Sequence, residues 1–210
     1  MLKIKIHNIN YRKKNIIDQV DIEIFTFGLF GFFGKNGAGK TSFLKTFIKN
    51  IAFNGEIKLK NASLSEKKVA WIPTEPFLYE YLTIKEFCDF YAYTVKGDIL
   101  KNNYFFDIEN SKLLKECSTG TKKKAYINAV LQFDDYDIYI FDEPFNGLDI
   151  ESNYLLLNKI IELSKNNIVL ISSHIIEIIE PYLTEKFYIG NSKIEKIDNL
   201  VSIKNLFKDE

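Results

Sequence analysis

The sequence is poor in cysteine and arginine, and it carries no net charge. Its two cysteines, Cys88 and Cys117, lie far apart with no CxxC pair or histidine cluster nearby, which argues against a disulfide framework or a zinc site and fits a reducing compartment. Lysine plus arginine and aspartate plus glutamate number 28 each, and a neutral chain is a poor candidate for binding nucleic acid or an anionic membrane by charge alone. The chain has a single arginine, Arg12, and is rich in lysine, isoleucine and asparagine. We interpret this composition as a bias of the genome.

Long hydrophobic runs and linkers are missing as well. Uncharged stretches such as residues 25–34 are far too short to span a bilayer. The alternating N-terminus, residues 1–7, lacks the apolar segment of a signal peptide. Internal repeats and low-complexity segments are not seen. With 210 residues and 46% apolar content, the chain is expected to form one globular domain with a sizeable core.

Apolar periodicity divides the chain into alternating strands and helices. Alternating segments predict half-buried strands, and continuous apolar runs predict strands that are buried on both faces. The expected strands cover residues 2–9, 20–24, 27–33, 56–60, 69–72, 138–141 and 168–172, with a hairpin over 185–197 that turns at 190–192. The expected helices cover residues 40–49, most of 83–116, 118–131 and 151–163. This order predicts an α/β fold with a mostly parallel sheet flanked by helices, an N-terminal antiparallel edge and a helical insertion over residues 75–125.

Residues 34–41 read GKNGAGKT and match the phosphate-loop pattern GxxxxGK[ST]. The pattern follows an apolar strand and opens a helix, as it requires; the alternative is a glycine-rich turn with a surface lysine. Glycines let backbone N–H groups approach phosphate oxygens, and the helix N-terminus attracts them. Lys40 would reach the β- and γ-phosphates, and the Thr41 hydroxyl would hold Mg²⁺. The residues expected to contact the nucleotide are Gly34, Lys35, Asn36, Gly37, Ala38, Gly39, Lys40, Thr41 and Ser42.

Two carboxylates follow the apolar strand at residues 138–141. In a phosphate-loop fold, a carboxylate at the end of a neighbouring strand holds Mg²⁺, and Asp142 fits that role. Glu143 would then be placed to polarise an attacking water. Elsewhere in proteins, an acidic pair after a strand is usually a capped turn.

Several segments of the chain, taken together, resemble those of ABC ATPase domains. Residues 142–149, DEPFNGLD, resemble their Walker B and D-loop. Residues 118–121 lie where the ABC signature belongs, about 24 residues before Asp142, and His174 lies where the switch histidine belongs. Tyr11 precedes the phosphate loop by 23 residues, as does the aromatic residue that stacks on adenine in this family. Without the resemblance, a histidine such as His174 is more often part of the core, and a tyrosine such as Tyr11 is more often a packing residue.

The resemblance implies a single ABC ATPase domain over residues 1–210, with an N-terminal antiparallel β subdomain and with residues 75–125 as a helical subdomain inserted in a RecA-like core. It implies that ATP and Mg²⁺ bind, that Glu143 and His174 support hydrolysis, and that Asp149 of the D-loop helps to bind nucleotide. The most similar group is the bacterial ABC-2-type exporters of drugs, peptides or antibiotics.

The signature segment departs from the family pattern. Thr119 and Thr121 replace its usual first glycine and glutamine, while Ser118 and Gly120, which would contact the γ-phosphate of ATP on the other subunit, remain. The lysines at 122–124 then oppose the helix dipole. They are either a solvated patch or a sign that an anion approaches there, and in ABC proteins that anion is the ATP of the other subunit.

A second departure concerns the Q-loop. Thr74 stands where glutamine is usual, and it is too short to reach the metal or the water in the same way; Glu75 could substitute for it. We nevertheless group Thr74 with Thr41 and Asp142 as the expected metal site.

The partners implied by the resemblance are a second ATPase subunit, identical or not, and a separate transmembrane permease. Nucleic acid is not expected as a partner. The permease would dock near residues 77–87 and would place the chain in the cytoplasm, on the inner face of the membrane. The alternative is a soluble ABC ATPase without transport, such as an assembly scaffold or a nucleic-acid- or ribosome-associated protein. The sequence has no coiled coil, second phosphate loop, zinc module or basic face to support that alternative, and no Asn-Lys-x-Asp motif of a GTPase.

Overall fold

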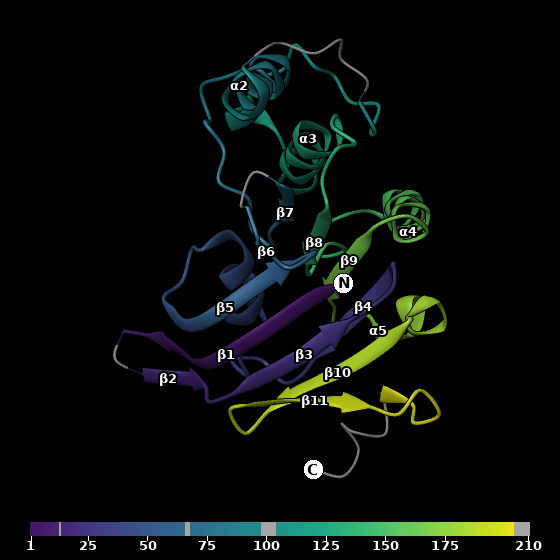
Figure 1. Ribbon diagram of the computed structural model, residues 1–210. Coiled ribbons are helices and arrows are strands. Elements are labelled where there is room, and N and C mark those ends of the chain that lie inside the picture. Colours follow the sequence, from purple (N-terminus) through teal and green to yellow (C-terminus); the bar gives the residue numbers. More distant parts are fainter. Residues whose placement is uncertain (13, 66–67, 98–103, 204–210) are drawn as a thin grey trace.

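The computed structural model describes residues 1–12, 14–65, 68–97 and 104–203, and two β-sheets with surrounding helices make up this part of the chain (Figure 1). The α-helices are α1 (Lys40–Lys45), α2 (Ile84–Lys96), α3 (Thr119–Leu131), α4 (Ile150–Ser164) and α5 (Ile176–Ile179). Short 3-10 helices are η1 (Thr46–Ile48), η3 (Leu114–Glu116) and η4 (Glu180–Tyr182). Among the described residues, no helix is long and apolar enough to cross a membrane.

The smaller sheet is antiparallel and is built around β1. Its strands are β1 (Leu2–Tyr11), β2 (Lys14–Ile17), β3 (Val20–Ile24), β5 (Phe53–Leu59) and β6 (Ala62–Ser63). β1 pairs with β2, β3 and β5. Leu2 and Ile4 on β1 are buried whereas Lys5 is exposed, because successive side chains of a strand point to opposite faces. The N-terminal strands are therefore antiparallel, as predicted, but they form a sheet of their own rather than an edge of the parallel sheet, and β2 and β6 were not predicted.

The larger sheet is mostly parallel, as the apolar runs predicted. Its strands are β4 (Gly28–Phe33), β7 (Val69–Ile72), β8 (Ile138–Asp142), β9 (Ile168–Ser172), β10 (Glu185–Gly190) and β11 (Lys193–Ile197). Their order is β11-β10-β4-β9-β8-β7, and only the β10–β11 pairing is antiparallel within the described sheet. The predicted hairpin is confirmed: Asn191 and Ser192 both have positive φ (49° and 59°), as a two-residue hairpin turn requires.

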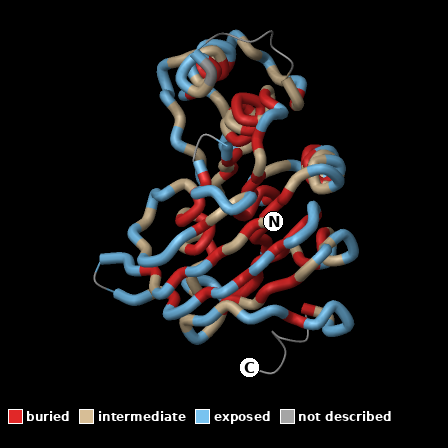
Figure 2. Tube along the Cα trace, viewed as in Figure 1, coloured by how far each residue is buried: buried red, intermediate tan, exposed pale blue. Residues whose placement is uncertain are grey.

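The central strands β4, β8 and β9 of the larger sheet are buried on both faces. Alternate residues of its central strands enter two different cores: Phe30 and Phe32 of β4 face the core shared with the smaller sheet and α1, whereas Leu29 and Phe33 face the core shared with α4. β8 and β9 divide in the same way. In Figure 2 the red of buried residues is concentrated in the middle of the molecule. The two cores fix the strand register, because a slip by one residue would exchange them.

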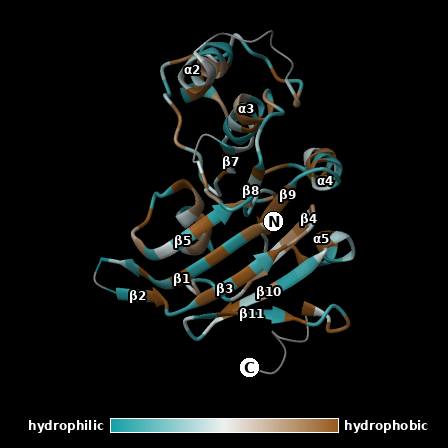
Figure 3. Cartoon of the chain, in the orientation of Figure 1, coloured by the Kyte–Doolittle hydropathy of each residue, from teal (hydrophilic) through white to brown (hydrophobic). Residues whose placement is uncertain are grey.

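The α2–α3 end of the molecule lies beyond β7 and β8 (Figure 1). It has a small core of its own, made by Ile84, Phe87, Cys88, Leu114, Ala125 and Ala129. Helix α2 begins with a capping box between Thr83 and Glu86 and ends at Gly97, whose φ is 77°. Figure 3 shows hydrophilic and hydrophobic residues mixed on both helices. The boundary of an inserted subdomain at residues 75–125 stays a prediction, and α3 itself continues to Leu131.

The prediction that most of residues 83–116 are helical is wrong after Lys96 for the residues that the structure describes. Residues 104–113 form bends and turns rather than a helix. The cause is a contact from α3: Asn128 accepts the Phe106 N–H at 2.6 Å and donates to the Phe106 carbonyl at 2.9 Å. These two bonds satisfy the backbone of Phe106 without a helix, so local aromatic spacing misled the prediction. Residues 98–103 lie outside the described residues.

Candidate functional site

The phosphate loop connects the buried strand β4 to helix α1. Its first residue, Gly34, has no room for a side chain, because a Cβ there would lie 2.2 Å from the carbonyl oxygen of Ile189. The loop therefore packs directly against the end of β10, and its backbone turns toward the N-terminus of α1. This is the strand–loop–helix context that the sequence predicted.

Lys40 begins α1 and folds back over the loop. Its Nζ donates to the carbonyl oxygens of Gly34 at 2.7 Å and Lys35 at 3.2 Å. Burial lowers the pKa of Lys40, while the nearby charges of Glu143 and Asp142 raise it. The result is a cation held at the loop by carbonyl groups, ready to attract an anionic phosphate.

Oxygen atoms from three elements converge on Asp142, at the end of β8. The Thr41 hydroxyl donates to Oδ2 at 2.8 Å, and the Thr74 hydroxyl donates to Oδ2 at 3.2 Å and to the Asp142 carbonyl at 3.1 Å. The Ser172 hydroxyl donates to Oδ1 at 2.6 Å. The three residues assigned to the metal site are thus brought together. Ser172 was missed, although a hydroxyl that ends an apolar strand beside β8 was a usable signal.

This donor set fits Mg²⁺, which prefers oxygen ligands. Among the described residues, no group of three or more histidine, cysteine, aspartate or glutamate side chains could hold a metal by itself. Mg²⁺ is usually bound through one or two carboxylates, with phosphates and water completing its shell. One buried carboxylate with the Thr41 and Thr74 hydroxyls suits that mode.

Glu143 has a left-handed backbone conformation, with φ of 49°, which is uncommon for a residue other than glycine. Its N–H lies 3.1 Å from both the carbonyl oxygen and the hydroxyl oxygen of Ser172. The His174 N–H donates to its Oε2 at 3.0 Å, and His174 Nε2 lies 3.0 Å from its Oε1. Burial raises the pKa of Glu143, and the charge of His174 lowers it. The chain therefore places a buried carboxylate and an imidazole together.

These groups surround one cavity of about 320 Å³. Its lining residues come from the phosphate loop, α1 and the ends of neighbouring strands: Ile16, Asn36, Gly37, Gly39, Lys40, Thr41, Ser42, Thr74, Glu143, Asn146 and His174. Open α/β sheets bind ligands at this position, outside the carboxyl ends of their strands. Ile16 and Asn146 were not predicted, because only the fold brings them to the phosphate loop.

Seven predicted nucleotide contacts are not among these lining residues: Gly34, Lys35 and Ala38 of the phosphate loop itself, and Tyr11, Ser118, Gly120 and Asp149 elsewhere in the chain. Tyr11 is 52% exposed and has the Arg12 guanidinium 5.4 Å from its ring centroid. Ser118 is exposed and caps α3 by accepting the Thr121 N–H at 3.1 Å, with Gly120 in the following turn. Asp149 caps α4, and its bond with the Lys124 side chain lowers the pKa of its carboxyl group.

The three consecutive lysines each have a partner within the chain. Lys122 pairs with Glu80 at 2.7 Å and Lys124 with Asp149 at 2.7 Å. Lys123 is buried, and its Nζ donates to the carbonyl oxygens of Glu143 at 2.8 Å and Asn146 at 3.0 Å. The prediction of a solvated patch is therefore wrong for Lys123. The partners of Lys122, Lys123 and Lys124 within the chain account for their positions without an incoming anion.

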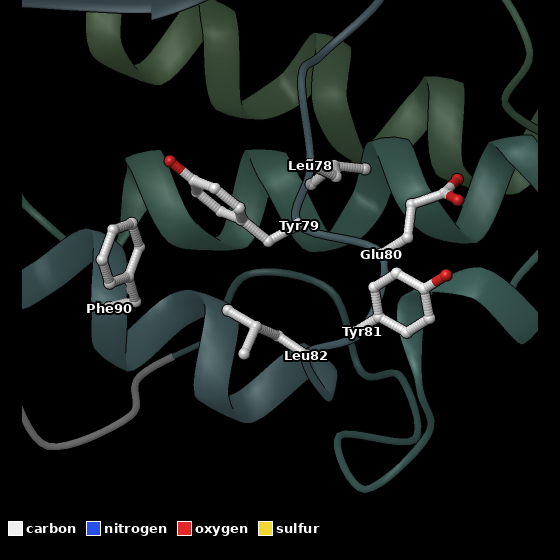
Figure 4. A pocket seen from close by; sticks show the side chains of 6 residues that line it. All are labelled: Leu78, Tyr79, Glu80, Tyr81, Leu82 and Phe90. Carbon is white, nitrogen blue, oxygen red and sulfur yellow. The ribbon is translucent and has the colours of Figure 1, made fainter.

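An apolar groove lies apart from this site, on the segment before α2 (Figure 4). Its volume is about 550 Å³, and its lining residues are Leu78, Tyr79, Glu80, Tyr81, Leu82 and Phe90. Figure 4 shows the Tyr79 ring beside Phe90, with ring centroids 5.2 Å apart. Phe77 and Tyr81 are 77% and 81% exposed. Large exposed aromatic side chains that gather in one place mark an interaction surface.

The chain is similar in sequence to proteins of one family. The family model described as ABC transporter matches residues 17–146. An uncharacterized ABC transporter ATP-binding protein of Methanocaldococcus jannaschii is 31% identical, over 85% of this chain and 70% of the relative. The ABC-type transporter ATP-binding protein EcsA of Bacillus subtilis is 25% identical, over 99% of this chain and 90% of the relative.

Solved structures have the same fold. The ATP binding subunit of an ABC transporter has a TM-score of 0.85 and 24% identity, over 100% of this chain and 98% of the other. A dimeric ATP-binding cassette in a post-hydrolysis state, bound to ADP and Pi, has a TM-score of 0.81 and 15% identity, over 96% of this chain and 100% of the other. The predicted fold class is thereby confirmed.

Proposed function

The chain belongs to the ABC transporter family, and we propose that it is the ATP-hydrolysing subunit that drives export through a separate membrane permease. ATP binding and ATP hydrolysis are its activity. The observation that carries the proposal is the convergence of Lys40, Asp142, Glu143 and His174 at one end of the larger sheet. Export of a drug, peptide or similar solute is the finer part of the proposal, and it rests on resemblance to the ABC-2-type exporters.

The proposed metal site is formed by Thr41, Asp142 and Thr74. When bound, Mg²⁺ would neutralise charge on the β- and γ-phosphates during phosphoryl transfer. Asp142 supplies the carboxylate, and Ser172 holds that carboxylate in place from the opposite oxygen. Lys40 adds a positive charge at the same phosphates, in the role that a phosphate-loop lysine has.

Glu143 and His174 are the proposed catalytic residues. Oε1 of Glu143 has no hydrogen-bond donor in favourable geometry within the described part of the chain, although His174 Nε2 lies 3.0 Å away. This oxygen can therefore accept a proton from a water that attacks the γ-phosphate. Burial makes the carboxylate a stronger base by raising its pKa. His174 orients the carboxylate and can hydrogen-bond the γ-phosphate from the same side.

A second subunit is proposed to complete the site. Ser118 and Gly120 lie at the exposed N-terminus of α3, away from the cavity of their own chain. A helix N-terminus favours anions, so Ser118 and Gly120 would meet the ATP bound to a partner ATPase subunit. For Asp149, itself an anion, the same role rests on the resemblance. Tyr11 is proposed to stack on the adenine ring. Its exposed ring leaves a face available for that contact.

The apolar groove before α2 is the proposed docking site for the permease. Its aromatic lining and Glu80 suit a short amphipathic helix of the membrane subunit. Docking there would place the chain on the inner face of the cell membrane. The groove favours this function over a soluble ABC ATPase without transport, because such a protein would use the same ATP site but has no evident need of an exposed aromatic groove.

The Glu143→Gln variant tests the proposal. It should bind ATP, lose at least about 100-fold in turnover, and accumulate as a dimer with ATP in size-exclusion chromatography with light scattering. Glu162→Gln, at an exposed glutamate of α4, is the matched control and should behave as wild type. Wild-type turnover in Glu143→Gln would remove Glu143 from the catalytic role.

The permease is tested by a pull-down of tagged Glu143→Gln chain from its native host in mild detergent with ATP. A co-purifying multi-span membrane protein supports the transporter assignment. Recovery of soluble partners alone would support the non-transport alternative and leave the ATP chemistry intact.

A further inference from the structure

The first turns of α3 pack against the loop between β8 and α4, residues 143–149, which we call the 143–149 loop. At Gly120 a Cβ would lie 2.7 Å from the Gly147 carbonyl oxygen, so the two backbones are in close contact. Lys124 pairs with Asp149 at the far end of the loop. Lys123 lies between these contacts and reaches the start of the loop.

Lys123 is an unusual residue for this position because its ammonium group is buried. The residue is 2% exposed, and its Nζ donates to two backbone carbonyls, those of Glu143 and Asn146. Removing an ammonium group from water costs free energy unless hydrogen bonds replace the water. Here the replacement bonds are charge-assisted, and such bonds are about twice as strong as neutral ones. Both carbonyls are thus held by one side chain, and the Glu143 carbonyl also accepts the Asn146 N–H at 3.4 Å.

The carbonyl at Glu143 matters because the backbone there is strained. A left-handed conformation at a residue other than glycine persists only where the surroundings enforce it. Ser172 binds the N–H of Glu143, His174 binds its carboxylate, and Lys123 binds its carbonyl oxygen. Ser172 ends β9 and His174 follows it, whereas Lys123 belongs to α3.

We propose that Lys123 is a positioning residue for the catalytic carboxylate: it fixes the backbone of Glu143 from α3 and so sets the rate of hydrolysis. This inference rests on the proposed function, in which Glu143 acts on the ATP of its own chain. Because Ser118 at the start of the same helix is proposed to meet the ATP of the partner subunit, Lys123 joins the two ATP sites of a dimer within one chain. No atom of Lys123 needs to touch ATP for this role.

The test compares three variants of the full-length chain. Lys123→Met removes the ammonium group, Lys123→Arg keeps a cation with several donors, and Lys122→Met removes the neighbouring charge, which pairs with Glu80 rather than with the 143–149 loop. We expect Lys123→Met to lower kcat by about 10- to 100-fold, as a small misplacement of a catalytic group does, with the KM for ATP and the Kd for a non-hydrolysable ATP analogue within about twofold. Lys123→Arg should recover most of the rate, and Lys122→Met should match wild type.

A second measurement shows whether Lys123 acts through Glu143. In single-turnover experiments, Lys123→Met should slow hydrolysis strongly in the wild-type background but by less than about twofold in the Glu143→Gln background, because residues that act as a unit are non-additive. Equal slowing in both backgrounds would overturn the proposal, as would wild-type kcat in Lys123→Met. If Lys123→Met does not fold, Lys123→Gln, which keeps a neutral donor, takes its place in the same comparison.

The failure of this inference is distinguishable from failure of the proposed function. If Glu143→Gln abolishes hydrolysis while the Lys123 variants keep wild-type kcat, only the positioning role is lost. If Glu143→Gln itself hydrolyses ATP at the wild-type rate, the proposed catalytic role is lost, and the positioning role is lost with it.

Discussion

The hydroxyl group of Ser172 donates a 2.6 Å hydrogen bond to Oδ1 of Asp142, across the parallel pairing of β9 with β8. Both residues are buried, and both end their strands. The same hydroxyl oxygen lies 3.1 Å from the N–H of Glu143. One small side chain thereby connects the proposed metal ligand to the proposed base.

Ser172→Ala should weaken both stability and metal binding. The substitution leaves a buried carboxylate oxygen without its donor, which should lower the free energy of unfolding by about 1–3 kcal/mol. Chemical denaturation measures this loss, and an ATPase titration with Mg²⁺ should show a higher half-saturating metal concentration. Ser164→Ala, at a half-buried serine whose hydroxyl donates to the Ile161 carbonyl of the same helix, is the control. An unchanged Mg²⁺ titration would contradict the role given to Ser172.

Lys40→Ala should abolish tight ATP binding. Hydrogen bonds to charged groups contribute about 1.5–3 kcal/mol, so the Kd for a fluorescent ATP analogue should rise by roughly 10- to 150-fold. Lys45→Ala, at the other end of α1, removes the same charge away from the cavity and should change the Kd little. Retained tight binding in Lys40→Ala would refute the phosphate-loop assignment.

Thr74→Val tests the residue that replaces the Q-loop glutamine. The change keeps the shape but removes both hydrogen bonds to Asp142. Turnover at limiting Mg²⁺ should fall several-fold and recover at saturating Mg²⁺, because the loss is in metal affinity. Thr94→Val, at an exposed threonine of α2, controls for the loss of a hydroxyl. Thr74→Gln separately restores the family residue, and unchanged partner-stimulated turnover would show that the departure is inconsequential.

Turnover should depend on pH through Lys123. Burial lowers the pKa of Lys123 to about 8, although the charges of Glu143 and Asp142 raise it. Below that pH the charged ammonium group binds the Glu143 carbonyl strongly, and above it the neutral amine binds more weakly. The kcat of wild type should therefore fall between pH 7 and 9, measured at saturating ATP. The kcat of Lys123→Arg should stay flat over this range, since a guanidinium group keeps its proton.

The free energy of unfolding should also depend on the titration of Lys123, but it should rise with pH where kcat falls. The folded-state pKa of Lys123, about 8, lies below the ordinary lysine value of 10.5, so the unfolded chain binds more protons between these pH values. The free energy of unfolding of wild type should rise, relative to that of Lys123→Met, as pH increases from 8 to about 10. Urea denaturation at several pH values measures the difference. A difference that falls with pH would contradict the burial of a charged Lys123.

Local sequence signals were enough for the phosphate loop, the strand with its two carboxylates and the β10–β11 hairpin. Each is encoded within about ten consecutive residues, by glycine placement, an apolar run or turn chemistry. Ser172 and Ile16 were missed, and the buried position of Lys123 was not predicted, because their roles depend on which elements pack together. The same cause explains residues 104–113, where Asn128 of α3 holds Phe106 out of a helix. Strands β2 and β6 are short edge strands, too short to show a period.

The burial of β4, β8 and β9 on both faces has a consequence for hydrogen exchange. Their amide protons can meet solvent only when both cores open together, so they should exchange at the rate of global unfolding. The phosphate loop, Asp142 and Ser172 all lie at or next to the ends of these strands. The atoms that must hold an ATP phosphate are therefore attached to strands whose amides should exchange slowly, while the edge strands β2 and β6 should exchange early without disturbing them.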